Sequence, residues 1–111
     1  MAHGQHGQTD TGMQSLGTFT LRGKRYQIVR VRQPLIVDGM ECDGTCEPRD
    51  LPRPKIRVVH GLNDERELDV FIHEMLHACF WDLDETPITE AATDIASVLF
   101  KLGYRKHGHQ T

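Results

Sequence analysis

The segment from about Asp64 to Trp81 constrains the fold most, because it reads as a helix that must be covered on most of its sides. Acids fill its first turn, and Asn63 or Asp64 can cap it. Apolar side chains surround most of the cylinder, unlike the single stripe of a surface helix: Leu68, Val70, Phe71, Ile72, Met75, Leu76, Ala78, Cys79, Phe80 and Trp81. Because 111 residues leave room for only one core, we expect this helix to be the central element.

Other patterns supply partners for this helix. Thr86-Pro87 can start a second helix over about residues 87–102, with apolar residues at helical spacing: Ile88, Ala91, Ile95, Val98, Leu99 and Leu102. Alternation from Thr18 to Val31 predicts a β-hairpin, and residues 55–60 predict a third strand. Four prolines between residues 34 and 54 predict an irregular loop, extended only at residues 35–37.

These elements predict an α+β fold in which a small antiparallel or mixed three-stranded sheet packs on two helices. Residues 17–106 are expected to form this single domain. Residues 1–16 are rich in Gly, Gln, His and Thr and contain almost no large apolar side chains, which predicts a disordered N-terminal arm. Residues 107–111 are expected to form a flexible tail.

Charge and cysteine content narrow the class of protein. A formal net charge of −3 does not favour nucleic acid as a partner. No run approaches the roughly 18 apolar residues that span a bilayer, and the start of the chain lacks a signal-peptide pattern, so we expect a cytoplasmic protein without a membrane segment. Three cysteines are an odd number and too few for a secreted disulfide scaffold, so reduced thiols are expected.

The central helix carries the arrangement His73-Glu74-Met75-Leu76-His77. Histidines at i and i+4 project from one face and can bind one metal ion, while Glu74 lies about 100° around the helix, near enough to reach a metal-bound water. This spacing predicts zinc bound by both histidines, with Glu74 as general base. The alternative is two ordinary histidines and a solvated glutamate. The apolar neighbours disfavour it, because three ionisable groups are costly to bury without a metal.

A catalytic zinc site usually has three protein ligands, so a third must come from elsewhere. Glu90 lies in the first turns of the second helix, which can fold back against the first, and we predict that it is this ligand. Asp94 follows four residues later and is predicted to hydrogen-bond a ligand histidine. Both could instead be solvated surface acids. The loop acids Asp82, Asp84 and Glu85 are rivals, expected to cap or solvate the turn.

The chain resembles minimal gluzincin-type zinc peptidase cores, including SprT-like and ImmA/IrrE-like domains. The residues that carry the resemblance are 68–78 and the later pattern Glu90-x-x-x-Asp94-x-Ala96. It is also similar to short phage and bacterial proteins that end in a helix and a Leu-Gly-Tyr-Arg tail. The resemblance covers about residues 55–106. It implies a zincin-like fold, Zn²⁺ held by His73, His77 and Glu90, Glu74 as base, and attack of water on a peptide bond. Without the extra domains of larger relatives, the cleft is expected to be shallow.

The function expected from these features is zinc-dependent hydrolysis of a peptide or protein substrate, held in extended form by a sheet edge at Ile56–His60. One alternative is a non-catalytic, zinc-stabilised binding or regulatory module, although such a site has no use for Glu74. Another is metal-assisted hydrolysis of nucleic acid, ranked last because those sites resemble three-histidine patterns lacking the glutamate.

Cys42-x-x-x-Cys46 leaves several readings open. The two residues could join a second zinc site, although the spacing is not the usual C-x-x-C, and free loop thiols are the simpler interpretation. A thiolate from this loop could also cap the open position on the zinc ion.

Overall fold

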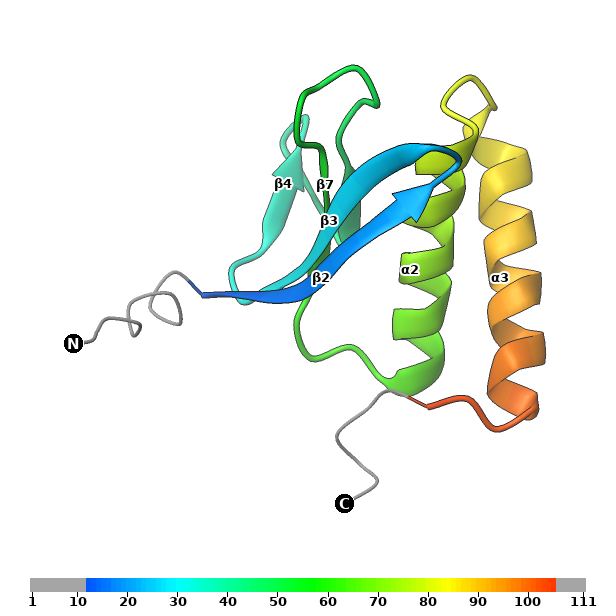
Figure 1. Cartoon of the computed structure of the whole chain (residues 1–111). Coiled ribbons are helices and arrows are strands. Elements are labelled where there is room, and N and C mark those ends of the chain that lie inside the picture. The colour runs from blue at the N-terminus through cyan, green and yellow to red at the C-terminus, as the bar shows by residue number, and fades with distance from the viewer. Residues whose placement is uncertain (1–11, 106–111) are drawn as a thin grey trace.

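The computed structural model describes residues 12–105, which form an α+β fold of one sheet, one small hairpin and two helices (Figure 1). Along the chain the elements are β2 (Met13–Leu21), β3 (Lys24–Val31), β4 (Leu35–Val37), β5 (Met40–Cys42), β6 (Gly44–Cys46), β7 (Lys55–Val59), α2 (Asp64–Cys79) and α3 (Glu85–Lys101). The α+β prediction is confirmed. Within the described part of the chain, neither helix has both the length and the apolar character that a membrane crossing requires.

The main sheet has four strands in the order β2-β3-β7-β6, one more than predicted. β2 and β3 form the expected antiparallel hairpin, β7 runs parallel to β3, and β6 is antiparallel to β7, so the sheet is mixed. β2 begins at Met13, inside the segment expected to be a disordered arm, and its register shifts between Ser15 and Gly17. Residues 1–11 and the expected tail at 107–111 lie outside the described residues.

The prediction of an irregular loop over residues 34–54, extended only at residues 35–37, was wrong for β5 and β6. β4 and β5 pair around Asp38 and Gly39, whose φ angles of 52° and 78° are those of a two-residue hairpin turn. The next strand, β6, adds to the sheet beside β7. The edge of the sheet beside α2 is therefore β6, and Ile56–His60, which we expected to be the exposed edge, belongs to an internal strand.

α2 lies between the sheet and α3, which explains its apolar residues on nearly all sides (Figure 1). On the sheet side, Val70 and Ala78 pack in one buried cluster with the inner strands: Tyr26, Ile28, Ile56 and Val58. On the opposite side, Ile72 packs against Ala92 and Ala96 of α3. The central position expected for this helix is confirmed, and both layers of the core depend on it.

Polar contacts fasten α2 at both ends. Near its N-terminus, buried Glu67 accepts two hydrogen bonds from Arg30 of β3, at 2.7 and 2.9 Å. The Asn63 side chain caps the same end by accepting a hydrogen bond from the backbone N–H of Arg66. At the C-terminus, Arg49 donates to the carbonyl oxygens of Ala78 at 2.6 Å and Leu21 at 3.0 Å, joining the helix end to the β2–β3 turn. The orientation of α2 against the sheet is therefore fixed by charged hydrogen bonds as well as by packing.

Candidate metal centre

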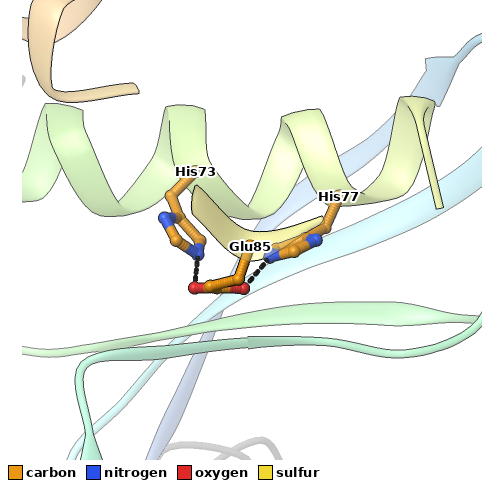
Figure 2. A group of neighbouring side chains, drawn as sticks. All are labelled: His73, His77 and Glu85. Atoms are coloured by element: carbon orange, nitrogen blue, oxygen red, sulfur yellow. Dashed lines mark hydrogen bonds and ion pairs between the residues drawn. The ribbon is translucent and has the colours of Figure 1, made fainter. Parts of the chain in front are cut away.

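Two histidines of α2 and one glutamate of α3 meet at a single point (Figure 2). Nε2 of His73 lies 2.9 Å from Oε2 of Glu85, and Nε2 of His77 lies 2.9 Å from Oε1 of the same carboxylate. The two imidazole rings are 4.8 Å apart between centroids, with an interplanar angle of 65°. The ligand-type atoms of these three residues all lie within 4.8 Å of one another. Histidine nitrogens and a carboxylate converge here as they do around a metal ion.

The helical hairpin explains why Glu85 completes this group. His73 and His77 are one turn apart on α2, and residues 80–84 then reverse the chain, so that α3 begins at Glu85 beside the end of α2. Glu85 lies three residues before Ile88, which is 1% exposed and packs on the inner face of α3. Residues three apart share a helix face, so the carboxylate is directed toward the histidines.

Glu90 and Asp94, the predicted third ligand and its companion, are not in this group. Both are exposed on α3. Glu90 is two residues past Ile88, and Asp94 is two residues past the buried Ala92, which turns each of them about 200° from the inner face. The second helix does fold back against the first, as predicted. The acid that it brings to the histidines is Glu85, one of the three loop acids that we named as rivals and expected to cap or solvate the turn.

The inner face of α3 is built from small residues, and this is what the sequence interpretation missed. Bulky side chains suggested a face formed by Ile88, Ala91 and Ile95, but Ala91 is exposed and Ile95 is 42% exposed. The face that meets α2 contains Ala92 and Ala96, at 0% and 1% exposure. Alanines let two helices approach closely. A helical wheel that gives most weight to large apolar side chains assigns the contact with α2 to the larger neighbouring residues instead. The signal that could have identified Glu85 is its i, i+3 and i, i+7 relation to Ile88 and Ala92.

Glu74 differs from every other acid of the site because it is buried and has no polar partner. It is 7% exposed, and no hydrogen bond or ion pair to its carboxylate occurs within residues 12–105. Burial, reinforced by the charge of Glu85, raises the pKa of Glu74 from 4.5 to about 7. A carboxyl group with a pKa near neutrality can exchange a proton at physiological pH, which is what a general base requires.

Gly44 allows the edge strand to lie against Glu74. A Cβ atom added to this glycine would stand 2.6 Å from Cγ1 of Val70 and 3.0 Å from Oε2 of Glu74. The first distance is shorter than real Cβ contacts, and the second is tighter than most of them. The missing side chain therefore lets β6 run directly beside the carboxylate, a relation that the sequence did not predict.

The surroundings of His73 favour its neutral form. Burial lowers the pKa of this imidazole, His77 acts in the same direction, and Glu85 and Asp69 oppose them. Asp69 lies one turn before His73 on α2 and accepts hydrogen bonds from Thr93 at 3.2 Å and Arg66 at 3.4 Å. Asp69 thus acts on His73 through its charge, and no hydrogen bond joins the two within the described residues. A neutral imidazole is the form that binds metal ions.

The three converging residues and Glu74 line one side of a cleft of about 460 Å³ between α2, β6 and the β4–β5 hairpin. The apolar parts of its wall include Val37 and Trp81, which are 47% and 45% exposed. Its remaining lining residues are Cys42, Asp43, Gly44, Thr45, Cys46, Arg66, Asp69 and Val70. The cleft is large enough for several side chains of an extended ligand, and the histidines open into it.

All three cysteines are free, as predicted. Cys46 is held as a thiol, because burial raises its pKa to about 12, and its sulfur lies 3.5 Å from the carbonyl oxygen of Glu47. Burial also raises the pKa of Cys42, whose thiol donates toward the carbonyl oxygen of Leu35 at 3.7 Å. Neither sulfur belongs to the group formed by the histidines and Glu85. The idea that a thiolate caps the metal therefore gains no support.

The donor set of two imidazoles and one carboxylate suits zinc and other transition metals that bind imidazole, whereas calcium and magnesium prefer oxygen ligands alone. Zinc takes such ligands at about 2.0–2.2 Å, which separates tetrahedral ligand atoms by about 3.4 Å. Two of the separations here are 2.9 Å and all of them lie within 4.8 Å, so the three side chains would have to shift to hold the ion. Comparisons with family models, curated proteins and solved structures found no match to this chain.

Proposed function

We propose that this protein is a zinc-dependent peptide hydrolase in which His73, His77 and Glu85 bind the metal and Glu74 is the general base. The observation that carries the proposal is the convergence of the three ligand-type residues beside a buried glutamate that has no partner within the described residues. Two histidines and one carboxylate make three protein ligands. This number leaves one position for water, as in catalytic rather than structural zinc sites.

Bound zinc would supply a Lewis acid that lowers the pKa of water to near 7 and polarises a substrate carbonyl. Glu85 accepts a hydrogen bond from Nε2 of each histidine, because carboxylate oxygens only accept. A cation bound at these nitrogens would require each Nε2 proton to move to Nδ1 of the same ring. Acid protonates both ring nitrogens and leaves no lone pair for the cation, so zinc affinity should fall as the pH falls. The two hydrogen bonds to Glu85 hold the rings in this position before the metal arrives.

Glu74 supports hydrolysis rather than a purely structural role for the metal. Its carboxylate faces the cleft next to the histidines, yet it is not part of the ligand group. A carboxylate in this position can take the proton of the attacking water and deliver it to the leaving amine. A structural site gains nothing from a buried acid without a partner, which would only cost stability.

The edge strand supports a peptide as the substrate. β6 pairs with β7 on one side only, and it borders the cleft next to Glu74. Asp43 and Glu47 direct backbone hydrogen bonds to β7, so the alternate residues Gly44 and Cys46 turn their backbone groups away from it. An extended peptide added alongside β6 would pass the histidines. This role replaces the one we expected of Ile56–His60.

The experiment loads the purified protein with zinc, incubates it with a peptide library, and detects cleaved products by mass spectrometry. Glu74→Gln should bind zinc like the unaltered protein but lose at least about 100-fold of the rate, as expected for a general base. Glu65→Gln, an exposed acid of the same helix, serves as the matched control and should keep full activity.

Two results would contradict the proposal. Cleavage that survives in Glu74→Gln would point to a contaminating protease. Zinc bound at the predicted residues without cleavage of any library peptide would favour the binding or regulatory module instead.

A further inference from the structure

Resting on the proposed function, we infer that the cleft selects extended peptides with a lysine or arginine about two residues from the cleaved bond. The cleft walls carry an excess of negative charge, and one of the acids, Asp69, lies about one helical turn from His73. An apolar wall on the same cleft completes the preference.

Four carboxylates line the cleft against a single guanidinium. The carboxylates belong to Asp43, Asp69, Glu74 and Glu85, and the cation is Arg66. With these groups ionised, a zinc ion with two positive charges still leaves one excess negative charge. Positive ligands are therefore favoured and negative ones repelled, because the cleft walls screen charges less than bulk water does.

Asp43 and Asp69 share Arg66 and keep acceptor capacity toward the cleft. The guanidinium lies 2.9 Å from Oδ2 of Asp43 and 3.4 Å from Oδ2 of Asp69, so one cation is divided between two acids. Each ionised carboxylate can accept several hydrogen bonds in fixed directions. A substrate ammonium or guanidinium group can complete the pair.

Glu74 is the second, independent feature that points to a cationic ligand. It is 7% exposed, lines the same cleft, and makes no hydrogen bond or ion pair that the described residues could supply. A buried carboxylate of this kind is costly unless a positive charge or a donor comes close. Zinc satisfies part of this demand, and a basic substrate would satisfy more of it.

The helix sets the spacing between the basic residue and the reacting bond. Asp69 precedes His73 by four residues, which is about 6 Å along an α-helix. An extended peptide advances about 3.3 Å per residue, so 6 Å corresponds to about two residues. Val37 and Trp81 provide an exposed apolar wall, which suits an apolar side chain next to the cleaved bond.

The test uses three peptides of about nine residues with a central leucine, which differ only in carrying Lys, Gln or Glu two positions to each side. Both measurements use the zinc-loaded unaltered protein, in which Glu74 keeps its charge: fluorescence anisotropy immediately after mixing gives binding, and product formation gives cleavage. A lysine ammonium beside Asp43 and Asp69, screened by solvent and opposed by Arg66, is expected to give about a 10-fold preference for the Lys peptide over the Gln peptide. The Glu peptide should be the weakest, and 0.5 M salt should reduce the differences.

Charge-removal variants show whether the named acids cause the preference. Asp43→Asn with Asp69→Asn should bring the Lys to Gln ratio close to one, whereas Glu65→Gln, an equal change of charge outside the cleft, should leave it unchanged.

The outcomes separate this inference from the proposed hydrolysis. Cleavage of all three peptides at equal rates would overturn the basic preference and leave the hydrolase intact. Preferential binding of the Lys peptide without cleavage would support the preference and contradict the hydrolase. If no peptide is bound or cleaved, both are overturned.

Discussion

Replacing Glu74 by glutamine should stabilise the metal-free protein at alkaline pH and change its stability little in acid. Burial raises the pKa of this carboxyl from 4.5 to about 7 in the folded protein. At pH 4.5 the folded protein therefore keeps Glu74 protonated and the side chain costs little. As the pH rises from 4.5 to about 7, the unfolded chain ionises while the folded protein keeps its proton, so stability is lost; above pH 7 the folded protein buries the charge and the loss is complete.

The size of the effect follows from the two pKa values. Each pH unit between them corresponds to about 1.4 kcal/mol, so the interval from 4.5 to about 7 gives roughly 3 kcal/mol of unfolding free energy. Glutamine cannot ionise, so Glu74→Gln should recover most of this amount at pH 8.5 and almost none at pH 4.5. Zinc should reduce the gain, because a nearby cation stabilises the ionised carboxylate.

Urea unfolding followed by circular dichroism, with chelator present, measures the difference between the two proteins at each pH. Taking the difference removes the titration of the histidines and other acids, which both proteins share. A variant that is less stable at pH 8.5, or a gain that is the same at both pH values, would mean that Glu74 is not a desolvated carboxylate. The reasoning about its role as a base would then fail.

Three further predictions test the ligand assignment, the helix anchor and the edge strand. Glu85→Ala should lower zinc affinity, measured in competition with a chelating dye, by more than about 100-fold, which exceeds the usual effect of residues that only hydrogen-bond a ligand. Glu90→Ala should change the affinity less than about 3-fold. The reverse order would restore Glu90 as the ligand. Arg49→Ala should lower the free energy of unfolding by about 2–4 kcal/mol, because charged hydrogen bonds to three backbone oxygens are lost. Arg53→Ala, which removes an exposed side chain, should change it by less than about 0.5 kcal/mol. Equal effects would mean that Arg49 does not hold the end of α2. Gly44→Ala should cost about 1–3 kcal/mol through overpacking, and a neutral result in thermal unfolding would mean that β6 does not lie as close to α2 as described.

The central helix could be predicted from the sequence because its signals are local and strong. Acids in the first turn, a cap at Asn63 and apolar residues on nearly all sides fixed its position to within about two residues. The spacing of His73 and His77 then placed two imidazoles on one face without any knowledge of the rest of the chain. The strands of the first hairpin were recognisable for the same reason, since alternation is visible in the chain itself.

The edge strand and the third converging residue were not predicted, because both depend on a neighbour in space. β6 is Gly44-Thr45-Cys46, too short for a readable alternation, and it is a strand only because it pairs with β7. Glu85 joins the site because α3 meets α2 through Ala92 and Ala96, and small side chains carry little weight in a hydrophobic pattern. Sequence reasoning therefore placed His73 and His77 on one face of α2, as the structure has them, and misjudged which face of α3 would meet it.

A crystal structure of the zinc-loaded protein, with anomalous diffraction recorded at the zinc edge, tests the proposed metal centre most directly. One anomalous peak per chain should lie about 2.0–2.2 Å from Nε2 of His73, Nε2 of His77 and a carboxylate oxygen of Glu85, with Glu74 close by but outside bonding distance. No peak at this position, or a peak bound by cysteine sulfur or by Glu90 in place of Glu85, would contradict the assignment.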